Sequence, residues 1–125
     1  MNQPTENYER SRFVVLFHEF PADHKRNDHW DLMLQSGEKL DTWALSEMPG
    51  PGKSIPAVRI ADHRTCYLDF EGQVSGDRGR VTRVRRGEFF WVPGCGQTRA
   101  VLEFDEGRWE VEIRNEDQSC LIIVE

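Results

Sequence analysis

The residues best suited to chemistry lie in the first half of the chain, where all four histidines fall between positions 18 and 63 and near aspartates. In a β-strand, residues two apart share a face, so His29 and Asp31 would present an imidazole beside a carboxylate. Such a nitrogen and oxygen pair suits Mn²⁺, Zn²⁺ or Fe²⁺. An antiparallel neighbour could bring His18 to the same spot, and three ligands leave positions open for water or a phosphate oxygen. A surface hydrogen bond is the commoner role of a His-x-Asp pair, so spacing alone leaves both alternatives open.

A second group consists of Asp62 and His63, followed by Tyr67. A histidine and a tyrosine near a metal could bind and protonate a phosphate ester. The alternative is structural: His63 would cap its neighbours in a loop, and Tyr67 would lie at the edge of the core with its hydroxyl satisfied. Only a link to His29 and Asp31 favours the chemical alternative.

The elements that must position these groups are short strands, because apolar residues recur at a period of two along most of the chain. Turns rich in Gly, Pro and Asp separate them, and only 21–28 could form a brief helix. Many short strands predict a sandwich or barrel, and closing the sheet removes its exposed edges. The pattern therefore predicts a mostly β fold of eight to ten short strands with little helix, and leaves sandwich and barrel open. The predicted strands are 12–17, 29–34, 40–45, 57–60, 66–70, 79–86, 88–92, 100–105, 109–113 and 121–124.

Length and composition predict a single domain over residues 12–125, preceded by a flexible tail over residues 1–11. The polar first residues resemble neither a signal peptide nor an anchor, and no apolar run is long enough to span a membrane. The cysteines, Cys66, Cys95 and Cys120, are odd in number and form no CxxC pair. We therefore expect free thiols and a cytoplasmic location.

Charge is distributed unevenly along the chain, whose net charge is −6. That acidity argues against a protein that coats nucleic acid through bulk positive charge. Five arginines nevertheless fall within nine residues, and they could grip a few phosphates or simply form a solvated strand. They are Arg78, Arg80, Arg83, Arg85 and Arg86.

Three sequence segments resemble the 3′-phosphoesterase domain of bacterial DNA ligase D. FVVLFH at 13–18 is similar to the opening FVVQKH of that family. DLMLQSGEKLDTWA at 31–44 follows its DFRLELDGVLKSWA without a gap. AVR at 57–59, DH at 62–63 and YLDFEG at 67–72 follow AVRVEDHPLDYLDFEG. The last segment is the most specific of the three.

The resemblance implies a compact, closed or nearly closed β-barrel, here of about eight strands. It also implies a Mn²⁺ site, or a site for another divalent metal such as Zn²⁺, near the barrel's mouth. It assigns His18, His29 and Asp31 as metal ligands, and His63 and Tyr67 as active-site residues. The implied reaction removes a 3′-phosphate or a 3′-ribonucleotide from DNA ends during repair. The implied partners are DNA or RNA–DNA 3′ ends and separate ligase or repair proteins, with no membrane.

Three departures from the family pattern bear on activity. Ten residues separate His18 from His29, where the family has five, and His24 keeps the family interval without a following aspartate. Met33 replaces the arginine of DFR, and a thioether cannot replace a guanidinium on phosphate. The loss of such a contact costs ~1.5–3 kcal/mol, unless Arg59, Arg80 or Arg83 substitutes for it. Ala61 stands where the family has a glutamate.

Two other functions fit the same residues. Met33 and the acidic surface favour a non-catalytic module that recognises nucleic-acid ends or recruits repair partners. The acidic surface also fits hydrolysis of a small phosphoester. The retention of five polar groups that the resemblance places together favours the enzyme.

Overall fold

The computed structural model describes residues 8–125, and these form nine antiparallel strands joined in one sheet. A single 3₁₀ turn, η2 (Thr65–Leu68), interrupts the described chain. The strands are β1 (Ser11–Glu19), β2 (His29–Ser36), β3 (Lys39–Leu45), β4 (Lys53–Arg64), β5 (Gly72–Gln73), β6 (Arg80–Trp91), β7 (Arg99–Phe104), β8 (Gly107–Glu116) and β9 (Ser119–Val124).

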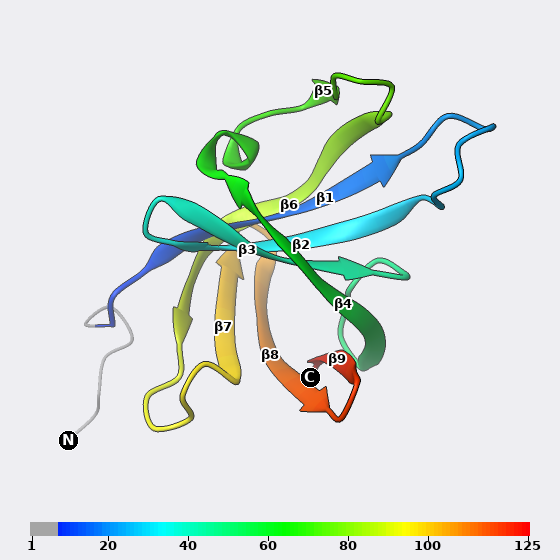
Figure 1. Cartoon of the computed structure of the whole chain (residues 1–125). Coiled ribbons are helices and arrows are strands. Elements are labelled where there is room, and N and C mark those ends of the chain that lie inside the picture. The colour runs from blue at the N-terminus through cyan, green and yellow to red at the C-terminus, as the bar shows by residue number, and fades with distance from the viewer. Residues whose placement is uncertain (1–7) are drawn as a thin grey trace.

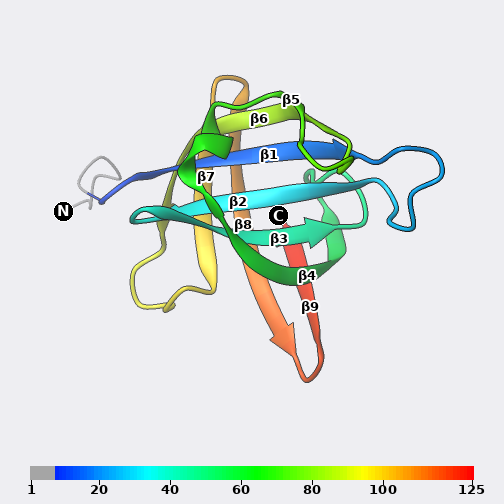
Figure 2. The same ribbon diagram turned by 45° about the horizontal axis from the view of Figure 1, so that its top comes forward.

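The sheet closes on itself because β1 pairs with β2 along one edge and with β6 along the other. The strand order is β1-β2-β3-β4-β9-β8-β7-β6, and β5 adds a short ninth strand outside β6. Figure 2 shows β1 lying between β6 and β2, and in Figure 1 the short β5 lies beside β6, away from the other strands of the barrel. The predicted mostly β, closed barrel of about eight strands is confirmed.

Two separate apolar clusters cover the two faces of the barrel wall. The first fills the interior and draws residues from all eight barrel strands, among them Phe13 and Val15 of β1. The alternate residues of β1, Val14 and Leu16, point outward and belong to the second cluster. That cluster is covered by the segment between β4 and β6, through Leu68 and Val74, with Tyr67 and Phe70 packed against it. The outer face of β1 and β2 is therefore as well buried as the inner one.

Two predicted elements are wrong. The segment 66–70 is not a strand but the turn η2, because Leu68 and its aromatic neighbours pack as a lid on the outer cluster. The segment 21–28 forms turns and no helix: the His24 N–H donates to the Pro21 carbonyl, and Asp28 Oδ1 accepts from the Phe20 N–H.

The predicted strands 79–86 and 88–92 are separated by Gly87. In the structure they are one strand, β6, and Gly87 lies within it. A Cβ atom built at this residue would lie 1.9 Å from the Glu103 carbonyl oxygen and 3.0 Å from the Phe13 ring. Glycine is required here because the backbones approach too closely for a side chain, and the strand continues through it.

The predicted tail lies partly outside the described residues, which begin at Tyr8. The Tyr8 ring packs 5.0 Å from that of Phe90, and Arg10 pairs with Glu103 at 3.1 Å. None of the described helical segments has the length and apolar character needed to cross a membrane. Cys66, Cys95 and Cys120 are free thiols, and burial raises the pKa of the Cys120 thiol.

Candidate metal centre

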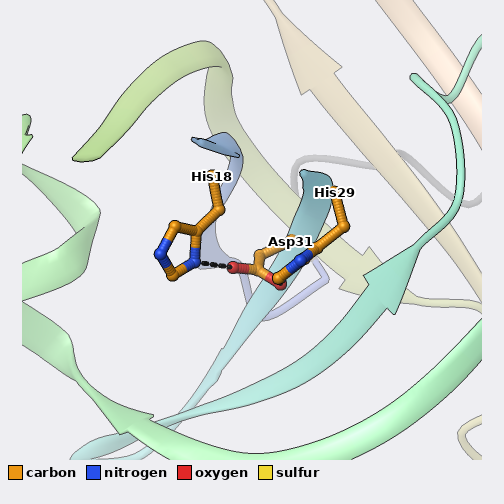
Figure 3. Close-up of side chains that lie close together, drawn as sticks. All are labelled: His18, His29 and Asp31. Atoms are coloured by element: carbon orange, nitrogen blue, oxygen red, sulfur yellow. Dashed lines mark ion pairs between the residues drawn. The ribbon is translucent and has the colours of Figure 1, made fainter. Parts of the chain in front are cut away.

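Three side chains predicted as metal ligands meet where β1 ends and β2 begins. His18 and His29 are directly opposite one another in the β1–β2 ladder, as the antiparallel hypothesis required, and Asp31 follows two residues along β2. His29 Nε2 lies 2.9 Å from Asp31 Oδ1, and His18 Nδ1 lies 3.6 Å from Asp31 Oδ2. Figure 3 shows both rings directed at the carboxylate. Within residues 8–125 this is the one group of three such side chains whose ligand atoms lie within 4.8 Å of one another.

Backbone carbonyls fix the orientation of both imidazoles from behind. His18 Nε2 lies 2.7 Å from the Arg78 carbonyl oxygen, and His29 Nδ1 lies 3.3 Å from that of Asn27. A carbonyl oxygen can only accept, so these two nitrogens carry the ring protons. In the neutral rings the opposite nitrogens then present lone pairs to Asp31. Metal-binding histidines are held in this way, with the second ring nitrogen bound to an outer acceptor.

The Asp31 carboxylate is buried, with only 2% of the residue exposed, and its Oδ1 has no hydrogen bond within the described chain. The 2.9 Å contact with His29 therefore has the distance but not the geometry of a hydrogen bond. A buried carboxylate oxygen without a donor is costly unless a cation or a proton compensates it. Two imidazole nitrogens and this oxygen form a donor set that fits a divalent transition metal.

The cluster perturbs the titration of its own members. Burial raises the pKa of Asp31, but the two imidazoles beside it outweigh burial and leave this pKa below its usual value. Burial lowers the pKa of His29, but the Asp31 carboxylate outweighs it, and the net result is a raised pKa; the Asn27 carbonyl adds to the rise and the Arg26 charge opposes it. Without a metal, a proton on His29 would compensate Asp31.

A pocket of about 120 Å³ joins this cluster to the second predicted group. Asp31 and His18 line one side, and His63 and Tyr67 line the same pocket from the end of β4 and from η2. Met33 also lines it, on the face shared with Asp31, and is 1% exposed. The pocket lies on the outer face of the barrel wall at one rim, under the segment that joins β4 to β6, and not in the barrel interior.

His63 is positioned by two acceptors. Its Nδ1 lies 3.1 Å from the Ala61 carbonyl oxygen and 3.1 Å from Thr42 Oγ1, whose own hydroxyl donates to the Leu40 carbonyl. The Nδ1 atom therefore carries the ring proton, and Nε2 is left to act on a molecule in the pocket. Tyr67 stacks edge-on against His63, with ring centroids 5.4 Å apart.

The three arginines predicted to hold phosphate do not line this pocket. Arg59 is committed to Asp41 and Asp62, each 3.1 Å away, and lies over the Trp43 ring. Arg80 lines a separate shallow depression beside Glu19 and Pro21. Arg83 lines another, beside Arg85 and Glu106. Nor does His24 join the metal cluster; its Nδ1 accepts the Arg26 N–H instead.

Two arginines do line the pocket: Arg26, which the sequence did not single out for phosphate, and Arg78, the first of the five clustered arginines that could grip phosphates. Arg26 lies in the inserted segment between β1 and β2, and Arg78 in the loop before β6. Neither residue belongs to a strand whose alternation could have predicted the direction of its side chain, so its charge was the only available signal. Thr42, which orients His63, was missed for a different reason: its position in the β3 pattern is that of a core residue.

The fold and the site together define a small closed barrel with a His/His/Asp cluster in an outer pocket. The sequence-family model of the DNA ligase D 3′-phosphoesterase domain matches residues 21–119, which is most of the chain. The chain belongs to this family, and its function is 3′-phosphoesterase-like, in the general processing of DNA ends. A search of curated proteins found no match.

Proposed function

We propose that the protein is a metal-dependent phosphoesterase that removes a 3′-phosphate or a 3′-ribonucleotide from DNA or RNA–DNA ends. The observation that carries the proposal is the buried Asp31 carboxylate, whose Oδ1 has no hydrogen bond and which faces two imidazoles whose protons point away from it. This cluster shares a pocket with His63 and Tyr67. Family membership supplies the class of substrate.

His18, His29 and Asp31 would hold Mn²⁺ or a similar ion, such as Zn²⁺, because nitrogen and carboxylate donors suit these metals. When bound, the ion would offset negative charge on the phosphoryl oxygens and lower the pKa of a bound water. His63 Nε2 would accept a proton from the attacking water or, when protonated, donate one to the phosphate. The Tyr67 hydroxyl would donate a hydrogen bond to a phosphoryl oxygen as negative charge develops there.

The experiment is a cleavage assay with the purified chain, Mn²⁺ and primer–templates ending in a 3′-phosphate, a 3′-ribonucleotide or a 3′-hydroxyl. We expect release of phosphate or ribonucleoside by the wild type and by Asp62→Ala, an exposed carboxylate outside the pocket. We expect none from Asp31→Ala or in excess chelator. Equal cleavage by wild type and Asp31→Ala, or no cleavage by the wild type, would reject the proposal for these substrates.

A second function is favoured by one observation. Met33 is fully buried and offers no charge to a phosphate, which is what a module that only binds nucleic-acid ends could tolerate. Such a module would bind 3′-phosphate ends, with or without a metal, and leave them intact after prolonged incubation with Mn²⁺. The same assay, followed by a binding measurement on the uncleaved substrates, distinguishes the two.

A further inference from the structure

A phosphate next to the His/His/Asp cluster would need a cation from the protein, and position 33 does not provide one. Met33 lies on the same face of β2 as Asp31 and is packed into the outer apolar cluster. The pocket wall contains just two arginines, Arg26 and Arg78. They differ in what their guanidinium groups already bind.

Arg78 is largely committed to its own loop. Its Nε donates to the Ser75 carbonyl at 2.7 Å and its Nη2 donates to the Ser75 hydroxyl at 3.1 Å. Its backbone carbonyl is the acceptor that holds His18. Arg78 therefore builds the pocket wall, and most of its side-chain fork is already used.

The Arg26 guanidinium, by contrast, has no carboxylate partner in the described chain. It lies over the Phe20 ring, 5.1 Å from its centroid, and the Phe20 ring in turn stacks on His18 at 4.2 Å with an angle of 21° between the planes. It is also near enough to His29 for its charge to act on that imidazole. A cation held on an aromatic face keeps its N–H donors available at the ring's edge for a ligand.

The segment that carries Arg26 is held in place by hydrogen bonds within itself. Asp28 Oδ1 accepts the Phe20 N–H at 2.8 Å and so ties the two ends of the loop together. The Arg26 N–H donates to His24 Nδ1 at 3.0 Å. The insertion that lengthens the interval between His18 and His29 thus delivers Arg26 to the pocket in a defined position.

We propose that Arg26 is the phosphate-binding arginine of this site, supplied by the loop between β1 and β2 in place of a charge at position 33. The inference rests on the proposed function for its substrate class, a terminal phosphate on DNA. Arg26 would make a forked contact with two phosphoryl oxygens while a third faces the His/His/Asp cluster. The residue then discriminates phosphate-bearing ends from 3′-hydroxyl ends.

The test compares equilibrium binding of two DNA hairpins, one ending in a non-hydrolysable 3′-methylenephosphonate and the other in a 3′-hydroxyl, with Mn²⁺ present. The wild type should prefer the phosphonate hairpin. Arg26→Gln should reduce that preference about 10- to 100-fold, and Arg26→Lys, which keeps the charge without the fork, should fall between them. Lys25→Gln is the matched control: it removes one positive charge from the exposed residue that precedes Arg26 and lies outside the pocket. This variant should keep the wild-type preference.

Equal preferences in Arg26→Gln and Lys25→Gln would overturn the inference, as would a wild type without any preference for phosphonate. Circular dichroism of each variant checks the fold, and Arg26 is exposed enough for all of them to fold. Turnover is measured separately on the cleavable 3′-phosphate hairpin. A wild type that prefers phosphonate through Arg26 but cleaves nothing would support the inference and reject the proposed phosphoesterase activity.

Discussion

Two acidic clusters lie on neighbouring strands of the barrel and differ in what completes them. In β2, Asp31 faces His18 and His29. In β3, Asp41 faces Lys39 at 3.5 Å and Arg59 at 3.1 Å. Each aspartate has a buried Oδ1 that makes no hydrogen bond within the described residues. The two carboxylates are alike in this respect, but their surroundings are not.

Asp41 is neutralised by the protein itself, because lysine and arginine carry their charges permanently. Asp31 faces two imidazoles whose ring protons are used by carbonyl groups behind them. Asp31 is also the more buried, with a side chain 3% exposed against 16% for Asp41. The Asp41 cluster is a complete ion-pair network, whereas the Asp31 cluster requires a bound cation or a proton. This contrast is the physical basis for treating only the Asp31 cluster as a candidate metal site.

The largest effect is expected when Asp31 is replaced by its isosteric amide, with the same replacement at Asp41 as the control. Asp31→Asn removes the anionic ligand, and we expect the bound metal and the phosphoesterase activity to fall by more than about 100-fold, since even residues behind the ligands typically cost 10–100-fold. Asp41→Asn should keep both near the wild-type level. Metal content after dialysis and initial cleavage rates measure the difference. Equal metal loss in the two variants would show that the contrast between the clusters is wrong.

The next effect separates metal binding from chemistry. His63→Ala removes the imidazole positioned by Thr42 and Ala61 but leaves His18, His29 and Asp31 in place. We expect the turnover number to fall about 10²–10⁴-fold, the range of a general acid or base, while the metal content stays unchanged. Loss of metal together with activity would instead assign His63 a role in building the metal centre.

The sequence predicted the functional residues whose positions follow the two-residue period of a β-strand. Alternation placed His29 with Asp31, and the antiparallel ladder then put His18 directly opposite His29. Gly87 escaped the same reasoning because the cause of its glycine, the Glu103 carbonyl, is 16 positions away in sequence and next to it in space.

The sequence did not predict which face of the wall would carry the site. Outward-facing side chains on a strand normally contact solvent, but Leu68 and Val74 cover those of β1. The sequence of 65–79 has no hydrophobic periodicity from which this packing could have been predicted. Loop residues escaped for a related reason. Arg26 reaches the pocket through turns fixed by Asp28 and His24, which depend on side-chain hydrogen bonds and not on a repeating pattern.

A smaller effect concerns pH in the metal-free protein. Because Asp31 raises the pKa of His29 above its ordinary value, the proton on His29 stabilises the fold. That contribution is complete below about pH 6.5 and is lost as the pH rises through the raised value. Asp31, whose pKa is lowered, stays ionised in this window and loses its contribution only in acid, as the pH falls through its own lowered pKa. We expect unfolding free energy to fall by at most about 1.4 kcal/mol per pH unit.

Urea unfolding in excess chelator at pH 6.5, 7.5 and 8.5 measures this slope. His29→Gln should flatten it. Asp41→Asn should not, because Asp62, the main cause of the raised pKa of Lys39, remains in this variant and keeps that lysine charged throughout the window. With Mn²⁺ the dependence should reverse, since metal binding requires the neutral imidazole and releases its proton. A slope that is the same with and without His29 would remove the electrostatic argument for the Asp31 cluster.

The smallest effect is expected from breaking the complete ion-pair network of the Asp41 cluster. Arg59→Gln removes the cation that pairs with Asp41 and Asp62 and lies over Trp43. Lys39 remains within 3.5 Å of Asp41 and 3.1 Å of Asp62, so neither carboxylate is left alone. Exposed ion pairs contribute little, and we expect cleavage rates and metal content within about twofold of the wild type. A large loss of cleavage with metal retained would return Arg59 to the phosphate-binding role that the sequence predicted for it, and would place the substrate across β3 and β4.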